Sequence, residues 1–183
     1  EILKIWKGGL ASHGASIGIL AAIYLFIKNF PGYTFLWIMD RLVITVAFGG
    51  ALVRLGNLFN SEIIGKAANI PWAFVFLKVD NVPRHPAQLY ESIGYFILFG
   101  ILFYLYMKKK EKVVPGSLFG IFLIILFGFR FLIEYFKEVQ EPFEQSMIIN
   151  MGQILSLPFI LGGIYLTHKA YSGKTIQATT DKK

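Results

Sequence analysis

Three short stretches of the sequence place charged and amide side chains beside long apolar runs. The first holds Arg54, Asn57 and Glu62, which directly follow an apolar run. A guanidinium and an amide three residues apart lie on one helix face, and both donate hydrogen bonds that an anion accepts. A helix that opened after Arg54 would add free backbone N–H groups. This stretch therefore predicts an anion site, with Gly56 and Gly65 as possible backbone pivots.

The second stretch, residues 84–91, leads from a loop into another apolar run. Pro86 suits the first turn of a helix, which would place Gln88 and Glu91 three residues apart on one helix face. Arg84 would remain in the loop, where it could meet a phosphate. Taken alone, the same residues would serve equally well as an interfacial anchor.

The third stretch has Arg130 inside an otherwise apolar run. A charged side chain at mid-membrane costs about 2.5–3.5 kcal/mol on insertion scales, so an arginine kept there is a functional candidate. Glu134 lies four residues on and can pair with Arg130 on the same helix face. The structural alternative is a salt bridge that reaches the membrane interface.

His13 is a candidate general base, because the ordinary pKa of a histidine suits proton transfer near neutrality. A lone histidine at a helix start is more often a cap or a packing residue, so both interpretations stay open. His85 and His168 share no metal-ligand spacing with it, and the sequence therefore predicts no metal site. Asp40 and Arg41 are adjacent, which predicts a local ion pair.

These side chains require apolar elements to position them. The 183-residue chain is 55% hydrophobic, with a mean hydropathy of +0.58. Soluble domains are roughly 45–50% apolar, so we expect an integral membrane protein of the all-α class. The net charge of +7 favours anionic lipid as a partner, and no basic stripe with aromatic side chains predicts nucleic-acid binding. The chain has no cysteine, which excludes disulfides and a cysteine nucleophile within it.

Five apolar runs approach the roughly 20 residues that cross a bilayer core. Because helices satisfy their own backbone groups in lipid, we expect about five transmembrane helices, over residues 12–30, 34–55, 86–107, 117–136 and 147–168. They would form one membrane domain over residues 1–171. The extracytoplasmic segment 56–85 would contain a small strand or hairpin, and the polar tail 172–183 would be disordered.

The lysines predict the orientation of these helices. Lys28, the run 108–112 and the C-terminal lysines are clustered in short connections and in the tail, which marks the cytoplasmic side. The start of the first helix, the end of the second, the start of the third and the end of the fourth would then meet at the outer leaflet. The polar residues at these four ends would converge on one site: His13, Arg54, Asn57, Asn60, Glu62, Arg84, Gln88, Glu91, Arg130 and Glu134.

These motifs, in this order, resemble those of the prolipoprotein diacylglyceryl transferase family. The likeness rests on residues 8–14, 54–65, 84–91, 130–134 and 151–156. The resemblance implies an enzyme of the bacterial inner membrane that catalyses the first step of lipoprotein maturation. Such an enzyme moves the diacylglyceryl group of phosphatidylglycerol to the lipobox cysteine thiol of a preprolipoprotein, forms a thioether and releases glycerol phosphate. The family has seven membrane helices, so two would precede this chain.

The resemblance also implies roles for individual residues. Arg54 and Arg130 would hold the lipid phosphate and stabilise the charge that develops on it. His13 would accept the thiol proton, and Glu134 would orient Arg130. No metal or other cofactor is implied. The residues that would bind or order the substrate are Asn57, Asn60, Glu62, Gly65, Arg84, Gln88, Glu91 and Glu134.

Two other functions stay open. A transporter or channel for an anionic solute would need polar residues through the membrane to the inner side, and the apolar runs hold few. A non-catalytic lipid-binding protein would use the same headgroup site without transfer. Val53 and Leu126 stand where the family usually has a glycine and a tyrosine, which keeps this last alternative open.

Overall fold

The computed structural model describes residues 12–138 and 149–180, and in this part the chain is all-α as predicted. The helices and strands are α1 (Ser12–Asn29), α2 (Phe35–Asn60), β1 (Phe74–Val75), β2 (Pro83–Arg84), α3 (Ala87–Lys109), α4 (Ser117–Ile133) and α5 (Met151–Thr180), with one-turn 3₁₀ helices η2 (Lys110–Lys112) and η3 (Glu134–Phe136).

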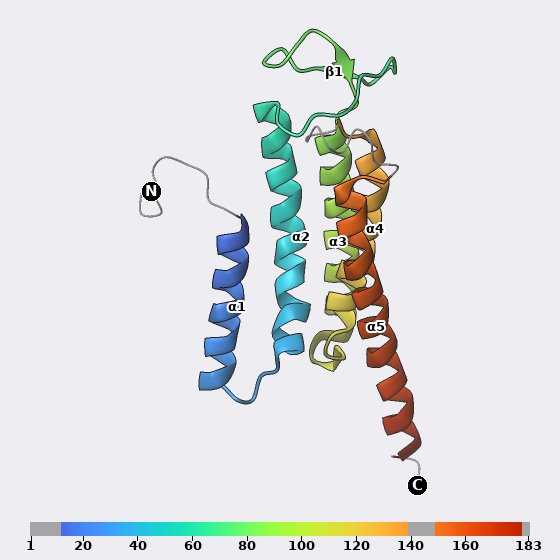
Figure 1. The fold of residues 1–183 in the computed structure, drawn as a ribbon. Helices are drawn as coiled ribbons and strands as arrows, with labels where there is room; N and C mark the ends of the chain where they lie inside the picture. The colour runs from blue at the N-terminus through green and yellow to red at the C-terminus, as the bar shows by residue number, and fades with distance from the viewer. Residues whose placement is uncertain (1–11, 139–148, 181–183) are drawn as a thin grey trace.

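The helices alternate in direction and lie side by side, with α1 next to α2 at one edge of the array (Figure 1). Among the described residues, α2, α3 and the continuous run of α4 and η3 are long and apolar enough to cross a membrane. The apolar stretch of α1, Ile17–Asn29, is shorter. The number of five membrane-spanning helices therefore stays a prediction with respect to α1 and α5.

Two helices extend further than the sequence predicted. α2 does not open after Arg54 but continues to Asn60, because Gly56 is accommodated within the helix. Ser61 then ends α2 with a left-handed φ of 62°. The free N–H groups expected after Arg54 are consequently bonded within the helix. At the C-terminus, the polar tail expected from residue 172 is helical up to Thr180.

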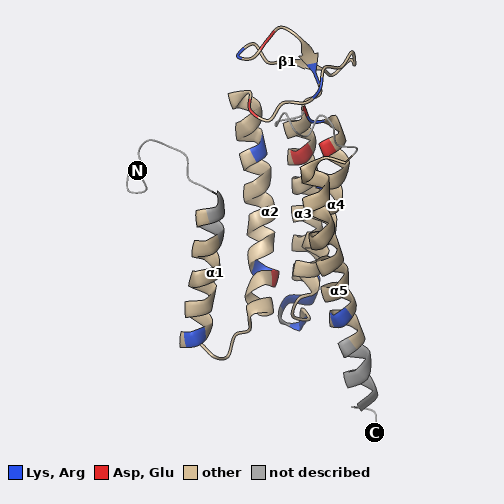
Figure 2. Cartoon of the chain, viewed as in Figure 1, with Lys and Arg blue, Asp and Glu red and all other residues tan. Residues whose placement is uncertain are grey.

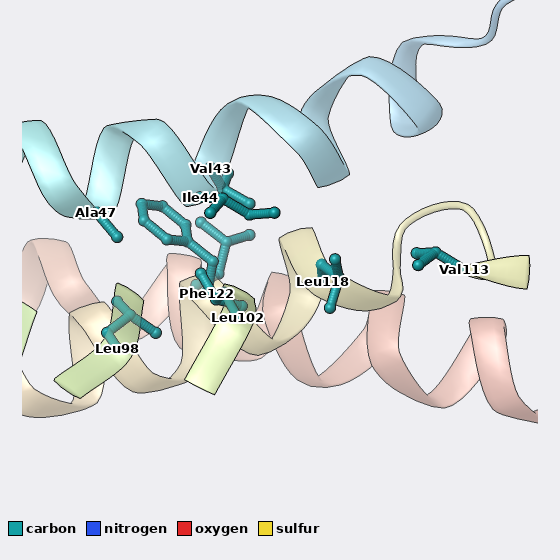
Figure 3. Close-up of a cluster of buried hydrophobic side chains, with 9 residues drawn as sticks. Val43, Ile44, Ala47, Leu98, Leu102, Val113, Leu118 and Phe122 are labelled. Atoms are coloured by element: carbon teal, nitrogen blue, oxygen red, sulfur yellow. The ribbon is translucent and has the colours of Figure 1, made fainter. Parts of the chain in front are cut away.

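The core lies between α2, α3 and α4 (Figure 3). α4 also packs closely on α5, since a Cβ atom on Gly163 would lie 2.8 Å from the Gly120 carbonyl oxygen. Close approach of this kind is typical of small residues in membrane helix pairs. The side chains of the apolar core are Val43, Ile44, Ala47, Leu98, Leu102, Val113, Leu118, Phe122 and Leu123.

The segment between α2 and α3 forms a small head beyond the end of the helices (Figure 1). β1 and β2 pair antiparallel in it, which confirms the predicted hairpin. The stretch 64–68 lies between two other parts of the chain. Its backbone bonds to residues 83–85 on one side and to residues 136–138 on the other, with N–O distances of 2.9 to 3.2 Å. The residues that follow α4 are thereby placed beside the start of α3.

At the opposite end of the helices, Asp40 is fully buried. Its two carboxylate oxygens accept hydrogen bonds from the backbone N–H groups of Gly116, at 2.6 Å, and Phe119, at 2.8 Å. The carboxylate caps the N-terminus of α4, where free N–H groups attract an anion, a role that the predicted local pairing with Arg41 did not include. The Arg41 guanidinium also lies 3.4 Å from the centre of the Trp37 ring.

Candidate functional site

Among the described residues, the charged ones gather toward the two ends of the helices, and few lie in the middle of the array (Figure 2). The end where α2 and α4 finish and α3 begins contains the predicted site residues. Four segments meet there: the C-terminal turns of α2, the first turns of α3, the junction of α4 with η3, and the stretch after η3.

Glu91 lies at the centre of this end and is fully buried. Its Oε2 atom is 3.1 Å from Arg54 Nε, and its Oε1 atom is 2.9 Å from Lys137 Nζ. One carboxylate on α3 therefore bridges a guanidinium on α2 and an ammonium group that follows η3. A buried carboxylate is costly without such partners, so Glu91 ties these three segments together.

Lys137 also holds a second carboxylate. Its Nζ is 3.3 Å from Glu134 Oε2, and only 5% of its side chain is exposed. The predicted pairing of Glu134 with Arg130 is therefore wrong. The α-helix changes to a 3₁₀ turn at Glu134, and in a 3₁₀ turn residues three apart lie directly above one another, which favours Lys137.

A chain of hydrogen bonds extends from Arg54 to the loop after α2. Arg54 Nη1 donates to Asn57 Oδ1 at 3.4 Å, and Asn57 Nδ2 donates to Glu62 Oε2 at 2.7 Å. Gln88 is fully buried on α3 and donates from Nε2 to the Glu62 backbone oxygen at 2.5 Å. The structure thus brings together the predicted residues of the first two motifs.

Arg130 lies in the last turn of α4 and is partly buried. Within residues 12–138 and 149–180, its guanidinium forms no hydrogen bond or ion pair. Arg130 stands one helical turn before Glu134, and Tyr95 on α3 lies near Arg130, Arg54 and Glu91, so Arg130 is beside the cluster. Among the described residues, Glu91 pairs with Arg54 and Lys137, Glu134 pairs with Lys137, and Arg130 has no carboxylate partner, so its positive charge is in excess.

Arg84 does not stand free in the loop as predicted. Its Nη2 is 2.5 Å from Asp80 Oδ2, its Nη1 is 2.6 Å from Glu138 Oε2, and Nη1 also donates to the Gly65 backbone oxygen at 3.4 Å. The Asp80 carboxylate raises the pKa of Arg84, and the hydrogen bond from Arg84 lowers the pKa of Asp80. The Arg84 guanidinium already has carboxylate partners, because β2 places it between the head and the stretch after η3. Its ion pairs join these two parts.

The remaining predicted residues differ in their positions. Gly65 is buried against the second motif, because a Cβ atom on it would lie 2.7 Å from His85 Cβ and even closer to the His85 carbonyl oxygen. Asn60 is exposed at the end of α2 and makes no side-chain hydrogen bond to the described cluster. The backbone of His13 belongs to the first turn of α1, and its side chain lies outside the described residues.

Two members of the cluster were not singled out by the sequence analysis. Lys137 stands three residues after Glu134, a spacing at which side chains can pair, but it lies just beyond the predicted helix 117–136 and was therefore not selected. Tyr95 lies one helical turn after Glu91, among other aromatic residues that gave no reason to select it. In the part of the chain that the structure describes, no group of histidine and carboxylate side chains has the geometry of a metal site.

The fold and the cluster together define a helical membrane protein with a cluster of buried charged side chains at one end of its helices. The profile of the prolipoprotein diacylglyceryl transferase family matches residues 1–168. The chain belongs to this family.

Curated relatives from three bacteria agree with this assignment. A phosphatidylglycerol–prolipoprotein diacylglyceryl transferase of Tolumonas auensis is 51% identical over 166 residues, which is 91% of this chain and 64% of the relative. Proteins of the same name from Chloroherpeton thalassium and Bacteroides fragilis are 43% and 46% identical, over 98% and 86% of this chain and 67% and 56% of their own lengths. The chain thus spans roughly 56–67% of these three relatives.

Proposed function

We propose that the whole protein transfers the diacylglyceryl group of phosphatidylglycerol to the lipobox cysteine thiol of a preprolipoprotein. Family membership supports the reaction, since the relatives carry both substrates in their names. The observation within the chain that best supports it is the excess positive charge on Arg130 beside the Arg54–Glu91–Lys137 chain. A partly buried cation without a carboxylate partner suits the phosphate of an anionic lipid.

The reaction forms one bond and breaks one. The thiol sulfur bonds to the glyceryl carbon that carries the phosphate, and the bond between that carbon and the phosphate oxygen breaks. The thiol proton passes to a base, and glycerol phosphate leaves. The phosphate changes from a diester with one negative charge to a monoester that gains a second. Fixed cations at the phosphate therefore stabilise the transition state more than the bound lipid.

Arg130 and Arg54 would share this task in different ways. Arg130 is the cation with excess charge, and we assign it the main contact with the phosphate. Arg54 is fixed by Glu91 on Nε and by Asn57 on Nη1, so its orientation is set before the lipid arrives. A preorganised donor needs no rearrangement during the reaction, which favours catalysis. His13 remains the candidate base for the thiol proton, on the family resemblance.

The other predicted residues would support the site. Asn57, Glu62 and Gln88 would order the loop that closes over the headgroup. Glu91 would fix Arg54 and Lys137. Gly65 and Arg84 would hold the head against the helices. We place this site at the outer leaflet of the bacterial inner membrane with the C-terminus in the cytoplasm, because lysines cluster at the opposite end of the helices.

Transfer can be measured with the whole protein purified in detergent and mixed with phosphatidylglycerol and a lipobox peptide. The expected product is the peptide with the added mass of one diacylglyceryl group, attached by a thioether. The control is a peptide with serine in place of cysteine, which should gain no mass. A folded protein that binds phosphatidylglycerol but never modifies the cysteine peptide would instead be a non-catalytic lipid-binding protein.

A further inference from the structure

Glu134 has two cations within reach along the chain, one on each side. Arg130 stands four residues before it and Lys137 three residues after it. Side chains four apart in an α-helix are neighbours, so a pair with Arg130 would be the ordinary outcome. The structure shows the other pair, with Lys137 Nζ 3.3 Å from Glu134 Oε2.

The position of Lys137 is fixed by the backbone around it. Lys137 pairs with Gly65 in a β-bridge, and the N–H of Glu138 donates to the Ile64 oxygen at 3.2 Å. These contacts hold the stretch after η3 against the loop that follows α2. The ammonium group of Lys137 is thereby directed inward, where only 5% of the side chain is exposed, and it meets Glu91 as well.

The other side of Glu134 is closed by α5. A Cβ atom on Gly152 would lie 2.6 Å from Glu134 Cδ and 2.8–2.9 Å from its two carboxylate oxygens. The absence of a side chain at this position therefore leaves the space that the carboxylate occupies. Glu134 is held between Gly152 and Lys137.

We propose that Lys137 is a positioning residue that keeps Arg130 available for the lipid phosphate. By neutralising Glu134, Lys137 prevents this carboxylate from neutralising Arg130. The inference rests on the proposed function, because it concerns the anion that Arg130 would bind. It also gives a reason for a buried lysine in the cluster: Lys137 acts through Glu134 and does not touch the substrate.

The proposal makes a specific kinetic prediction. Without Lys137, the Glu134 carboxylate would turn to Arg130, and phosphatidylglycerol would have to displace it. The cost of this displacement is the same in the bound lipid and in the transition state, so it raises KM and leaves kcat unchanged. A lysine needed merely for folding would lower thermal stability and the amount of active protein together.

The test compares Lys137→Met, Lys137→Arg and the double variant Lys137→Met/Glu134→Gln in the transfer assay. For Lys137→Met we expect the KM for phosphatidylglycerol to rise about tenfold, the size of a 1.4 kcal/mol loss in binding. Lys137→Arg keeps the charge and should stay close to the wild type. The double variant removes the competing carboxylate, so its KM should fall back toward the wild-type value.

Three results would overturn the proposal: an unchanged KM in Lys137→Met, a double variant as impaired as the single one, or a fall in kcat together with thermal stability. If Lys137→Met does not insert, Lys137→Gln takes its place under the same criteria. Failure of both to fold, with Lys137→Arg folded, would show a structural role and also overturn it. If the wild type shows no transfer, the proposed function fails. Binding of each variant to phosphatidylglycerol vesicles then tests the role of Lys137 separately: Lys137→Met should bind more weakly than the wild type, and the double variant should recover.

Discussion

The two ends of the helices use buried charge in opposite ways. At one end, both carboxylate oxygens of Asp40 accept hydrogen bonds from backbone N–H groups of Gly116 and Phe119 at the start of α4, so the carboxylate holds α2 to α4. At the other end, Glu91 pairs with Arg54 and Lys137, Glu134 pairs with Lys137, and Arg130 has no carboxylate partner in the part of the chain that the structure describes. A buried charge whose partners all lie within the protein stabilises the fold, whereas a charge without such a partner is available to a ligand.

This contrast predicts that removing Arg130 changes activity and leaves folding intact. For Arg130→Ala we expect transfer to fall by about 10²–10³-fold, the loss typical of one removed donor to a developing anion. Thermal stability in detergent should stay near the wild-type value, because no described partner loses a contact. Arg130→Lys, which keeps the charge without the planar fork, should be intermediate. A near-normal rate in Arg130→Ala would remove this residue from the mechanism.

Gly65 tests whether the head must fit closely onto the helices. A methyl group on Gly65 would clash with the backbone and Cβ of His85, so Gly65→Ala should lower both stability and transfer, with a destabilisation of about 1–3 kcal/mol. Gly56→Ala is the matched control, since a Cβ there would meet nothing within 4 Å and Gly56 lies inside α2. We expect the control to be neutral or slightly more stable. Equal behaviour of the two variants in thermal unfolding would contradict the close fit.

Asp40 should give the reverse of the Arg130 result. Asp40→Asn keeps one acceptor oxygen but loses the charge and the second acceptor, so we expect a loss of about 1–2 kcal/mol, typical of a weakened helix cap. The rate of transfer per folded molecule should stay within about twofold of the wild type, since each 1.4 kcal/mol on the barrier is tenfold. Thermal unfolding and specific activity measure the two quantities. A large loss of specific activity at unchanged stability would mean that the inner end also takes part in function.

The smallest expected effect is a loss of stability of the head, the segment between α2 and α3, at low pH. Arg84 lowers the pKa of Asp80 below its ordinary value of 3.8. A carboxyl group with a lowered pKa in the folded state stabilises the fold above its unfolded pKa, and this contribution is lost as pH falls through the folded pKa. The head should therefore loosen only below pH 3.8.

Trp72 can report this loosening, because its indole donates to the Tyr90 hydroxyl at 2.9 Å and joins the head to α3. Its fluorescence should change in acid in the wild type, with the change reduced in Asp80→Asn. An identical acid titration of the two proteins would show that Arg84 does not tie the head in this way.

Much of the fold could be predicted from the sequence because apolar runs of suitable length determine the helices. The ends of the helices were harder to predict. Gly56 suggested a break, yet α2 continues through it, and the local composition gave no signal for the 3₁₀ turn that begins at Glu134. The tail after residue 172 is polar, yet its backbone continues α5.

The candidate site divides in the same way. The three-residue spacing on one helix predicted that Arg54 and Asn57, and likewise Gln88 and Glu91, share a helix face. In the structure, Arg54 contacts Asn57 and Glu91, and Gln88 bonds to the loop after α2. The position of Lys137 could not be predicted, because it depends on pairing between the stretch after η3 and the loop after α2. Contacts between distant segments leave no periodic signal in the sequence.

The most direct test of the account is an experimental structure of the whole protein with bound phosphatidylglycerol. The account predicts that the lipid phosphate lies within hydrogen-bond distance, about 2.7–2.9 Å, of the Arg130 guanidinium, while Lys137 remains on Glu134 and Glu91. A phosphate bound elsewhere, with Arg130 paired to Glu134, would contradict it.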